Sequence, residues 1–342
     1  MSAIPISSES SNTLRRKLIG LSPAAAAIAY PFLLQAFHRA VSPPGAASSA
    51  AAVLLFLVFA MPLAGLAFAY RLSGVPQPSE FDLRARRLAF ASIAAPPLFV
   101  FIGVAPGVLG LHIPEVTVWT AIWLAAGLSV WLGGDAAAPA RTPQSIAGWR
   151  VAHGVAAAVI ACFVLFHLTN HLFGLAGPET HAAIMKAGRK VYRSAFVEPV
   201  LVTLLLFQLF SGVRLAWRWS ALRLDAYRVF QVGSGAYLAA FIFAHLNSAL
   251  VSARTVHKID TNWAWASGAP AGLIHDAWNI RLLPHYALGV FFVLGHLASG
   301  LRIVLMAHGV GSTIANRVWV AGLIVGAAIS TAIICALCGL RI

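Results

Sequence analysis

The chain has 342 residues, a formal net charge of +14, 60% hydrophobic residues and only 10% charged residues, with a mean hydropathy of +0.82. In a soluble globular domain about a quarter of the residues are charged, so this composition excludes one and predicts a polytopic membrane protein. The basic residues occur in short clusters between apolar runs, where they act as orientation signals and contact lipid headgroups. We therefore expect a lipid bilayer around the chain and no nucleic-acid partner.

Nine apolar runs are long enough to cross a bilayer as helices, which predicts an all-α transmembrane bundle. They cover approximately 19–37, 50–70, 88–111, 116–133, 150–174, 196–217, 228–252, 284–306 and 317–340. Turn-rich segments with Pro and Gly separate these runs and cannot continue a helix. The longest hinge-like segment begins at Gly133. The sequence therefore predicts an N-terminal helical layer over 19–134 and a C-terminal five-helix bundle over 149–342.

The distribution of basic residues predicts the orientation of the spans. More of the 24 Lys and Arg residues fall on the side of the N-terminus than on the opposite side, and segments rich in these residues stay in the cytoplasm. The first apolar run shows no small-residue cleavage site of the signal-peptide type. We expect an integral protein of a bacterial cytoplasmic membrane, with its N-terminus in the cytoplasm.

An internal repeat links two spans of the C-terminal half. The segment QLFSGVR at 208–214 matches HLASGLR at 296–302: a polar residue is followed by Ser-Gly and then by Arg. Weaker echoes begin at Met61 and Trp123 in the N-terminal half, where apolar residues replace the polar ones. The N-terminal half is therefore interpreted as a degenerate copy that binds no cofactor.

Polar side chains stand at two levels inside the spans of the C-terminal half. His167 and His245 lie at matching depths on spans that run in the same direction, and Gln208 and His296 do so on spans that run the other way. At a rise of about 1.5 Å per residue the two levels are on the order of 10 Å apart. Facing side chains hold haem in this way, and two imidazoles saturate its iron for electron transfer. The alternative is that each histidine hydrogen-bonds a neighbouring helix.

Other histidines carry weaker signals. His171 follows His167 by one helical turn. A contact with a haem carboxylate, a substitute ligand and a helix interface are the alternatives for it, and the interface is preferred. His153 and His285 lie near span ends, where snorkelling side chains are ordinary. His181 falls in a connecting segment and receives no predicted role.

Arg214 and Arg302 end the two repeated segments. Neutralisation of haem carboxylates, contact with a quinone carbonyl and orientation of the spans explain them equally well. Ser234 begins another Ser-Gly pair, which allows a helix or a macrocycle to approach closely. The tryptophan-rich loop 255–284 predicts an aromatic cap at the membrane interface.

From about residue 149 to 342 the chain resembles the cytochrome b membrane-anchor subunits of succinate:quinone and fumarate:quinone oxidoreductases, in particular the five-helix dihaem type. Three motifs carry the resemblance: FHL at 166–168, QVGSG at 231–235 followed by His245, and HLASG at 296–300. The resemblance implies that His167 and His245 ligate an outer haem b and that His296 forms one side of an inner site. It also implies a bound quinone and partner subunits of the flavoprotein and iron–sulfur type.

The chain departs from this family at Gln208, which occupies the ligand position of the second family helix. An amide is a poor ligand for haem iron. The sequence therefore predicts one haem per chain with two as the alternative, and His296 bonded to Gln208 or facing a quinone. The first 145 residues or so have no counterpart in the family.

The chain has no dinucleotide fingerprint and no iron–sulfur cysteine pattern, so dehydrogenase chemistry is assigned to partner subunits. The expected function is to carry electrons between such a partner and the quinone pool. The competing interpretation is a haem-free membrane anchor, scaffold or sensor with the same fold.

Overall fold

The computed structural model describes residues 8–42, 49–138 and 146–342. Within these ranges it is helical, with no strand and one isolated bridge between Ser79 and Ala137. Eight of the described helices are long and apolar enough to cross a membrane, and a bent pair makes a ninth. The prediction of an all-α polytopic membrane protein is confirmed.

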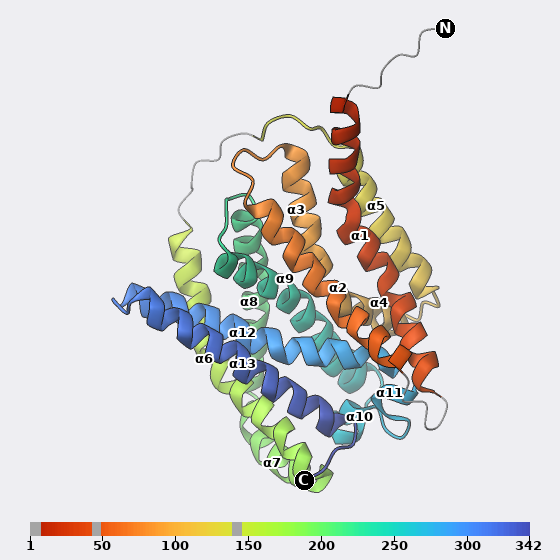
Figure 1. Ribbon diagram of the computed structural model, residues 1–342. Coiled ribbons are helices and arrows are strands. Elements are labelled where there is room, and N and C mark those ends of the chain that lie inside the picture. The colour runs from red at the N-terminus through yellow and green to blue at the C-terminus, as the bar shows by residue number, and fades with distance from the viewer. Residues whose placement is uncertain (1–7, 43–48, 139–145) are drawn as a thin grey trace.

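Thirteen α-helices and three short irregular helices make up the described chain (Figure 1). In chain order they are α1 (Ser8–Val41), α2 (Ser49–Ser73), α3 (Glu80–Ile93), α4 (Ala95–Val108), α5 (Glu115–Leu132), α6 (Ala147–Leu172), η1 (Phe173–Ala176), α7 (Pro178–Tyr192), α8 (Val197–Trp219), α9 (Ala226–Leu246), η2 (Asn247–Val256), α10 (Trp263–Ser267), α11 (Gly272–His275), η3 (Asn279–Arg281), α12 (Leu282–Ala307) and α13 (Ser312–Leu337).

The third predicted span is not one straight helix. It begins earlier than expected, because Ser79 and Asp82 form a capping box at the start of α3. The chain then bends by 66° between α3 and α4. Pro96 and Pro97 follow the break and sit in the first turn of α4, the one part of a helix where the missing N–H of proline costs nothing.

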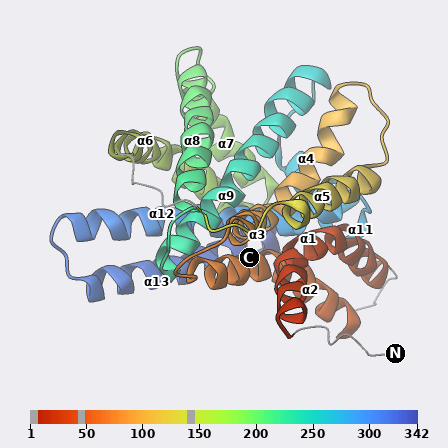
Figure 2. The same cartoon turned by 90° about the horizontal axis from the view of Figure 1, so that it is seen from above.

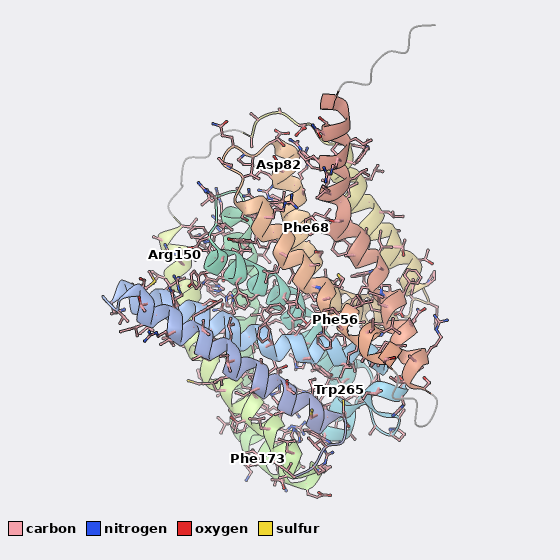
Figure 3. The ribbon with its side chains drawn as sticks, in the orientation of Figure 1. Phe56, Phe68, Asp82, Arg150, Phe173 and Trp265 are labelled. Atoms are coloured by element: carbon pink, nitrogen blue, oxygen red, sulfur yellow. The ribbon has the colours of Figure 1, made fainter. Side chains whose placement is uncertain are left out.

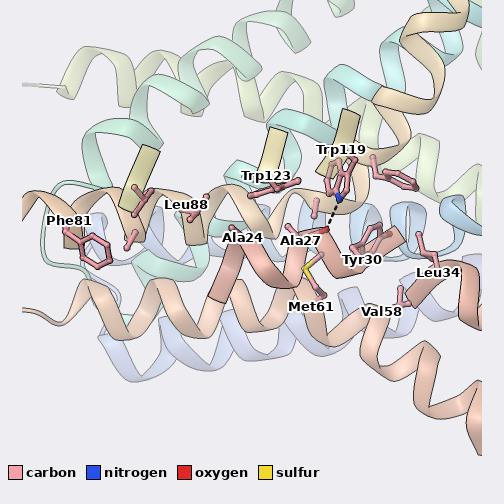
Figure 4. Packing of buried hydrophobic residues seen from close by; sticks show 14 residues of the cluster. Ala24, Ala27, Tyr30, Leu34, Val58, Met61, Phe81, Leu88, Trp119 and Trp123 are labelled. Carbon is pink, nitrogen blue, oxygen red and sulfur yellow. Dashed lines mark hydrogen bonds between the residues drawn. The ribbon is translucent and has the colours of Figure 1, made fainter. Parts of the chain in front are cut away.

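The N-terminal helices α1, α2, α3, α4 and α5 enclose a core of their own (Figure 4). Trp119 is 1% exposed, and its Nε1 donates to the carbonyl of Ala27 at 2.7 Å. Met61 and Trp123, which echo the polar positions of the repeat, are buried members of the same cluster. They therefore pack the interior of this layer.

The two halves of the chain share a second core. Phe90 and Ile93 of α3 belong to the same buried cluster as Phe230 and Tyr237 of α9. Arg86, which is fully buried, donates to the carbonyls of Ser220, Leu222 and Leu72 and so joins α3 to the segment between α8 and α9. The N-terminal layer is therefore packed directly against the C-terminal bundle.

Large apolar side chains cover the outside of the spans (Figure 3). Phe56 on α2 is 69% exposed, and Phe173, just beyond the end of α6, is also exposed. Figure 2 shows α6, α7 and α8 grouped on the side of the molecule opposite α1 and α2. Exposed apolar surface of this extent has lipid as its natural neighbour.

Candidate functional site

His167 and His245 come together between α6 and α9. Their ring centroids are 6.2 Å apart, with the ring planes at 69°. Each ring packs against a phenylalanine one helical turn earlier on its own helix: Phe163 lies 5.6 Å from His167, and Phe241 lies 5.6 Å from His245. Side chains at this spacing share one helix face, so the phenylalanines fix the direction of both imidazoles.

The helix that carries His245 changes its winding directly after it. α9 ends at Leu246, and the chain continues as the π-helix η2 through Val256. The predicted span 228–252 is thus one continuous segment from Ala226 to Val256. π-helical turns inside spans are rare and occur often at functional sites.

We call His167 and His245 the outer pair. Further histidines surround it. The His171 ring lies 4.7 Å from that of His167 and 5.3 Å from that of His181. His181 is 2% exposed and packs on Trp263. It lies between two spans as predicted, but on the helix α7 and not in a loop. His285 is buried against Phe241 and does not snorkel.

Three nitrogens in this histidine cluster have no hydrogen-bond partner among the described residues. They are the Nδ1 atoms of His171, His181 and His285. A buried polar atom without a partner is uncommon in a native protein and requires an explanation such as a ligand, an ion or an ordered water. The region around the outer pair therefore has unused capacity for polar contacts.

The inner level differs from the prediction. His296 is bonded to Ser234, with Nδ1 and Oγ 2.9 Å apart, and not to Gln208. Gln208 Nε2 instead donates to the backbone carbonyl of His153 at 2.7 Å. The imidazole that faces His296 belongs to His153, with ring centroids 6.4 Å apart.

His153 is predicted to snorkel at a span end, but it lies against Ser211 and His296 because the spans are not parallel rods. α12 and α13 form a hairpin whose members both contact α6 (Figure 1). His153 and His167 are separated along α6 by about 20 Å at about 1.5 Å per residue. The two levels therefore lie farther apart than the predicted 10 Å. We call His153 and His296 the inner pair.

Arg302 and Arg214, the arginines of the two repeated segments, lie in different surroundings. Arg302 lines a cavity of about 220 Å³ together with Arg228, Gln231 and Ser299. Its Nε donates to Asn316, and its guanidinium stacks on an aromatic ring. Arg214 stacks over the ring of Trp149 at 4.6 Å.

Both histidine pairs have the spacing that a shared iron requires. Two imidazoles on one iron place their ring centres about 6 Å apart, because the metal–nitrogen bond is about 2 Å long and the ring centre lies about 1 Å behind the nitrogen. In the described part of the chain no group of three or more His, Cys, Asp or Glu is arranged to hold a bare metal ion. Two facing imidazoles at this spacing are the number and type of protein ligands that a haem iron takes.

Comparison of the chain with protein-family models, curated proteins and solved structures found no match in any of the three. The fold and the site define a class: an all-α polytopic membrane protein with two pairs of facing imidazoles in its C-terminal half. The assignment of a function rests on these pairs.

Proposed function

We propose that the chain is an integral membrane cytochrome b-like subunit in which His167 and His245 bind haem b. The observation that carries this proposal is the 6.2 Å separation of the two rings, on two different helices, inside apolar spans. A histidine at such a position requires a partner, and intramembrane ionisable residues mark functional sites. The all-α bundle is the scaffold that such ligands require.

His167 and His245 would hold a haem that supplies one-electron transfer, and with both imidazoles on the iron no position would remain for oxygen. The chain contributes the orientation of the ligands, through the stacking of Phe163 on His167 and of Phe241 on His245. Neutral imidazoles suit this role, because their burial among apolar side chains disfavours the charged form.

The resemblance to the anchor subunits of succinate and fumarate:quinone oxidoreductases supports the rest of the proposal. A quinone in the bilayer and a flavoprotein or iron–sulfur partner at the membrane surface are the electron carriers on either side of the haem. We place the chain in a bacterial cytoplasmic membrane, and the distribution of basic residues supports an N-terminus in the cytoplasm.

The direct test is an absorption spectrum, reduced minus oxidised, of the full chain purified from cells supplied with haem precursor. We expect a b-type spectrum, and His167→Ala or His245→Ala should each remove the outer haem, because each variant lacks one of the two imidazoles that would hold it. His308→Ala is the control, since His308 is exposed. Full haem retention in both ligand variants would contradict the proposal, and a chain without haem would favour the anchor, scaffold or sensor alternative.

A further inference from the structure

The inner pair, His153 on α6 and His296 on α12, is built from two similar cradles. Each histidine meets a serine on a neighbouring helix: His153 Nδ1 lies 2.7 Å from Ser211 Oγ, and His296 Nδ1 lies 2.9 Å from Ser234 Oγ. Both serine side chains are buried, with exposed fractions of 0%. Two histidines from different helices therefore meet two fully buried hydroxyl groups through the same ring atom.

A glycine follows each of these serines and makes room for the ring. A Cβ atom built on Gly212 would lie 3.5 Å from Cε1 of His153, and one built on Gly235 would lie 3.2 Å from Cε1 of His296. The second contact is tighter than ordinary van der Waals contact. The Ser-Gly pairs of the sequence thus act here as cradles for imidazoles, in addition to allowing helices to approach.

Each serine can accept a hydrogen bond from its histidine. Ser211 Oγ lies 2.6 Å from the carbonyl oxygen of Phe207, and Ser234 Oγ lies 3.2 Å from that of Gln231. A hydroxyl that gives its one hydrogen to such a carbonyl accepts from Nδ1–H of the histidine. In that tautomer Nε2 keeps its lone pair, as in a histidine that binds a metal while its other ring nitrogen is hydrogen-bonded.

The inner-pair rings are 6.4 Å apart with their planes at 78°. A cation bound to two imidazoles requires a ring separation of about 6 Å. With the proton on Nδ1, each ring offers the lone pair of Nε2 to such a cation.

A basic cavity lies one helical turn from the inner pair. Ser299 on the helix of His296 and Gln231 on the helix of Ser234 both line it. Its charged lining consists of three arginines and one acid: Arg223, Arg228, Arg302 and Asp225. Asp225 already caps α9 by accepting from the backbone N–H of Arg228. The cavity is therefore complementary to a group that carries carboxylates.

We infer that His153 and His296 ligate the iron of a second haem, whose carboxylates are neutralised by the arginines of the adjacent cavity. The inference rests on the proposed function for the identity of the cofactor, but it uses other residues. It also differs from the assignment implied by the resemblance, since Gln208 is engaged with the backbone of α6. Ser211 and Ser234 are positioning residues in this site.

The haem-to-protein ratio of the full chain tests the inference. We expect a ratio near two, which falls to near one in His153→Ala, in His296→Ala and in His167→Ala. The double variant His153→Ala/His167→Ala should hold almost none. The haem retained at the outer pair in His153→Ala shows that this variant has folded. Gln208→His, which supplies the family's ligand type, should leave the ratio at two.

The possible results separate the inference from the proposed function. A ratio of one that survives His153→Ala and is lost in His167→Ala overturns the inference and keeps the proposed function. A ratio of one with the reverse pattern supports the inference and overturns the proposed function. A ratio that rises from one to two in Gln208→His overturns the inference, and a chain without haem overturns both.

The serines give a second readout that does not depend on loss of haem. Ser211→Ala and Ser234→Ala remove the acceptor of Nδ1–H, so each should shift the midpoint potential and the low-spin electron paramagnetic resonance signal of one haem while the other stays unchanged. Ser211→Thr keeps the hydroxyl and should restore the original signal. Identical spectra for the alanine variants and the parent chain would overturn the assigned role of the serines.

Discussion

The two histidine pairs are oriented by different kinds of side chain. Phenylalanines on the same helix fix the rings of His167 and His245 by stacking, which sets direction but leaves the tautomer free. Hydroxyl groups on neighbouring helices contact Nδ1 of His153 and of His296, which sets direction and favours one tautomer. A hydrogen bond from Nδ1–H raises the basicity of the other ring nitrogen. If both pairs bind iron as proposed, they are ligands of different strength within one bundle.

His181 predicts an acid sensitivity outside the spans. Burial, and then the positive charge of Arg189, lower the pKa of His181 to about 4 from its ordinary 6.5. The folded chain binds fewer protons than the unfolded chain between these values, so the stability from neutral His181 is complete above pH 6.5 and is lost as the pH falls toward 4. The full loss is on the order of 3 kcal/mol.

His181→Gln should flatten this dependence. The neighbours that face His181 are Asn170, His171, Trp263 and Arg189, and the variant leaves them in place. Thermal unfolding in detergent at pH 7.5 and pH 5 measures the effect, with exposed His308→Gln as control. An equal drop in melting temperature for His181→Gln and the parent chain would refute the prediction.

At the scale of single elements, the short turn η1 shows how closely the connections pack. Gly174 is buried in it, and a Cβ atom there would lie 1.9 Å from the Trp263 ring of α10. Gly174→Ala should therefore displace Trp263 and lower the free energy of unfolding by about 1–3 kcal/mol, as overpacking does.

Gly148→Ala is the matched control for Gly174→Ala. Gly148 lies in the first turn of α6 with nothing within 4 Å of its Cβ position, so alanine should be neutral or slightly stabilising there. Chemical denaturation in mixed micelles compares the two variants. Equal stability would mean that the contact between η1 and α10 is not rigid.

A structural feature could be predicted from the sequence where it depends on a single span. It could not be predicted where it depends on how two spans cross. Apolar length alone located eight spans, and equal depth on parallel spans brought His167 to His245. The break at Ala94 had a signal in Pro96 and Pro97, which hydropathy averaged away. The pairing of His153 with His296 depends on the angle at which α12 crosses α6. The depth of a residue along its own span does not reveal this angle.

At the scale of the whole molecule, polar links join the N-terminal layer to the C-terminal bundle. Arg281 of η3 pairs with Glu115 of α5 through two hydrogen bonds of 2.6 and 2.7 Å. Arg281 is 6% exposed and also stacks over Phe99 of α4 and Trp278. A position in the interface between two halves, unlike a span, leaves no periodic pattern in the sequence.

Glu115→Gln should destabilise the whole chain, because it leaves the Arg281 guanidinium buried without a counter-charge. Breaking a buried pair costs about 3–5 kcal/mol, and the partial exposure of Glu115 places the expected loss near the lower end. The pair Arg84 and Glu80 provides the control: it is more exposed and 3.4 Å apart, so Glu80→Gln should cost about 0.5 kcal/mol or less.

A double-mutant cycle with Arg281→Met separates the pair from the packing of the arginine. We expect Glu115→Gln/Arg281→Met to be more stable than the sum of the single changes, because the double variant buries no unpaired charge. Thermal unfolding monitored by tryptophan fluorescence measures each corner of the cycle. If Glu115→Gln costs no more than Glu80→Gln, the ion pair does not hold the two halves together. That role then falls to the shared apolar core around Phe230 and Tyr237 and to the hydrogen bonds of Arg86.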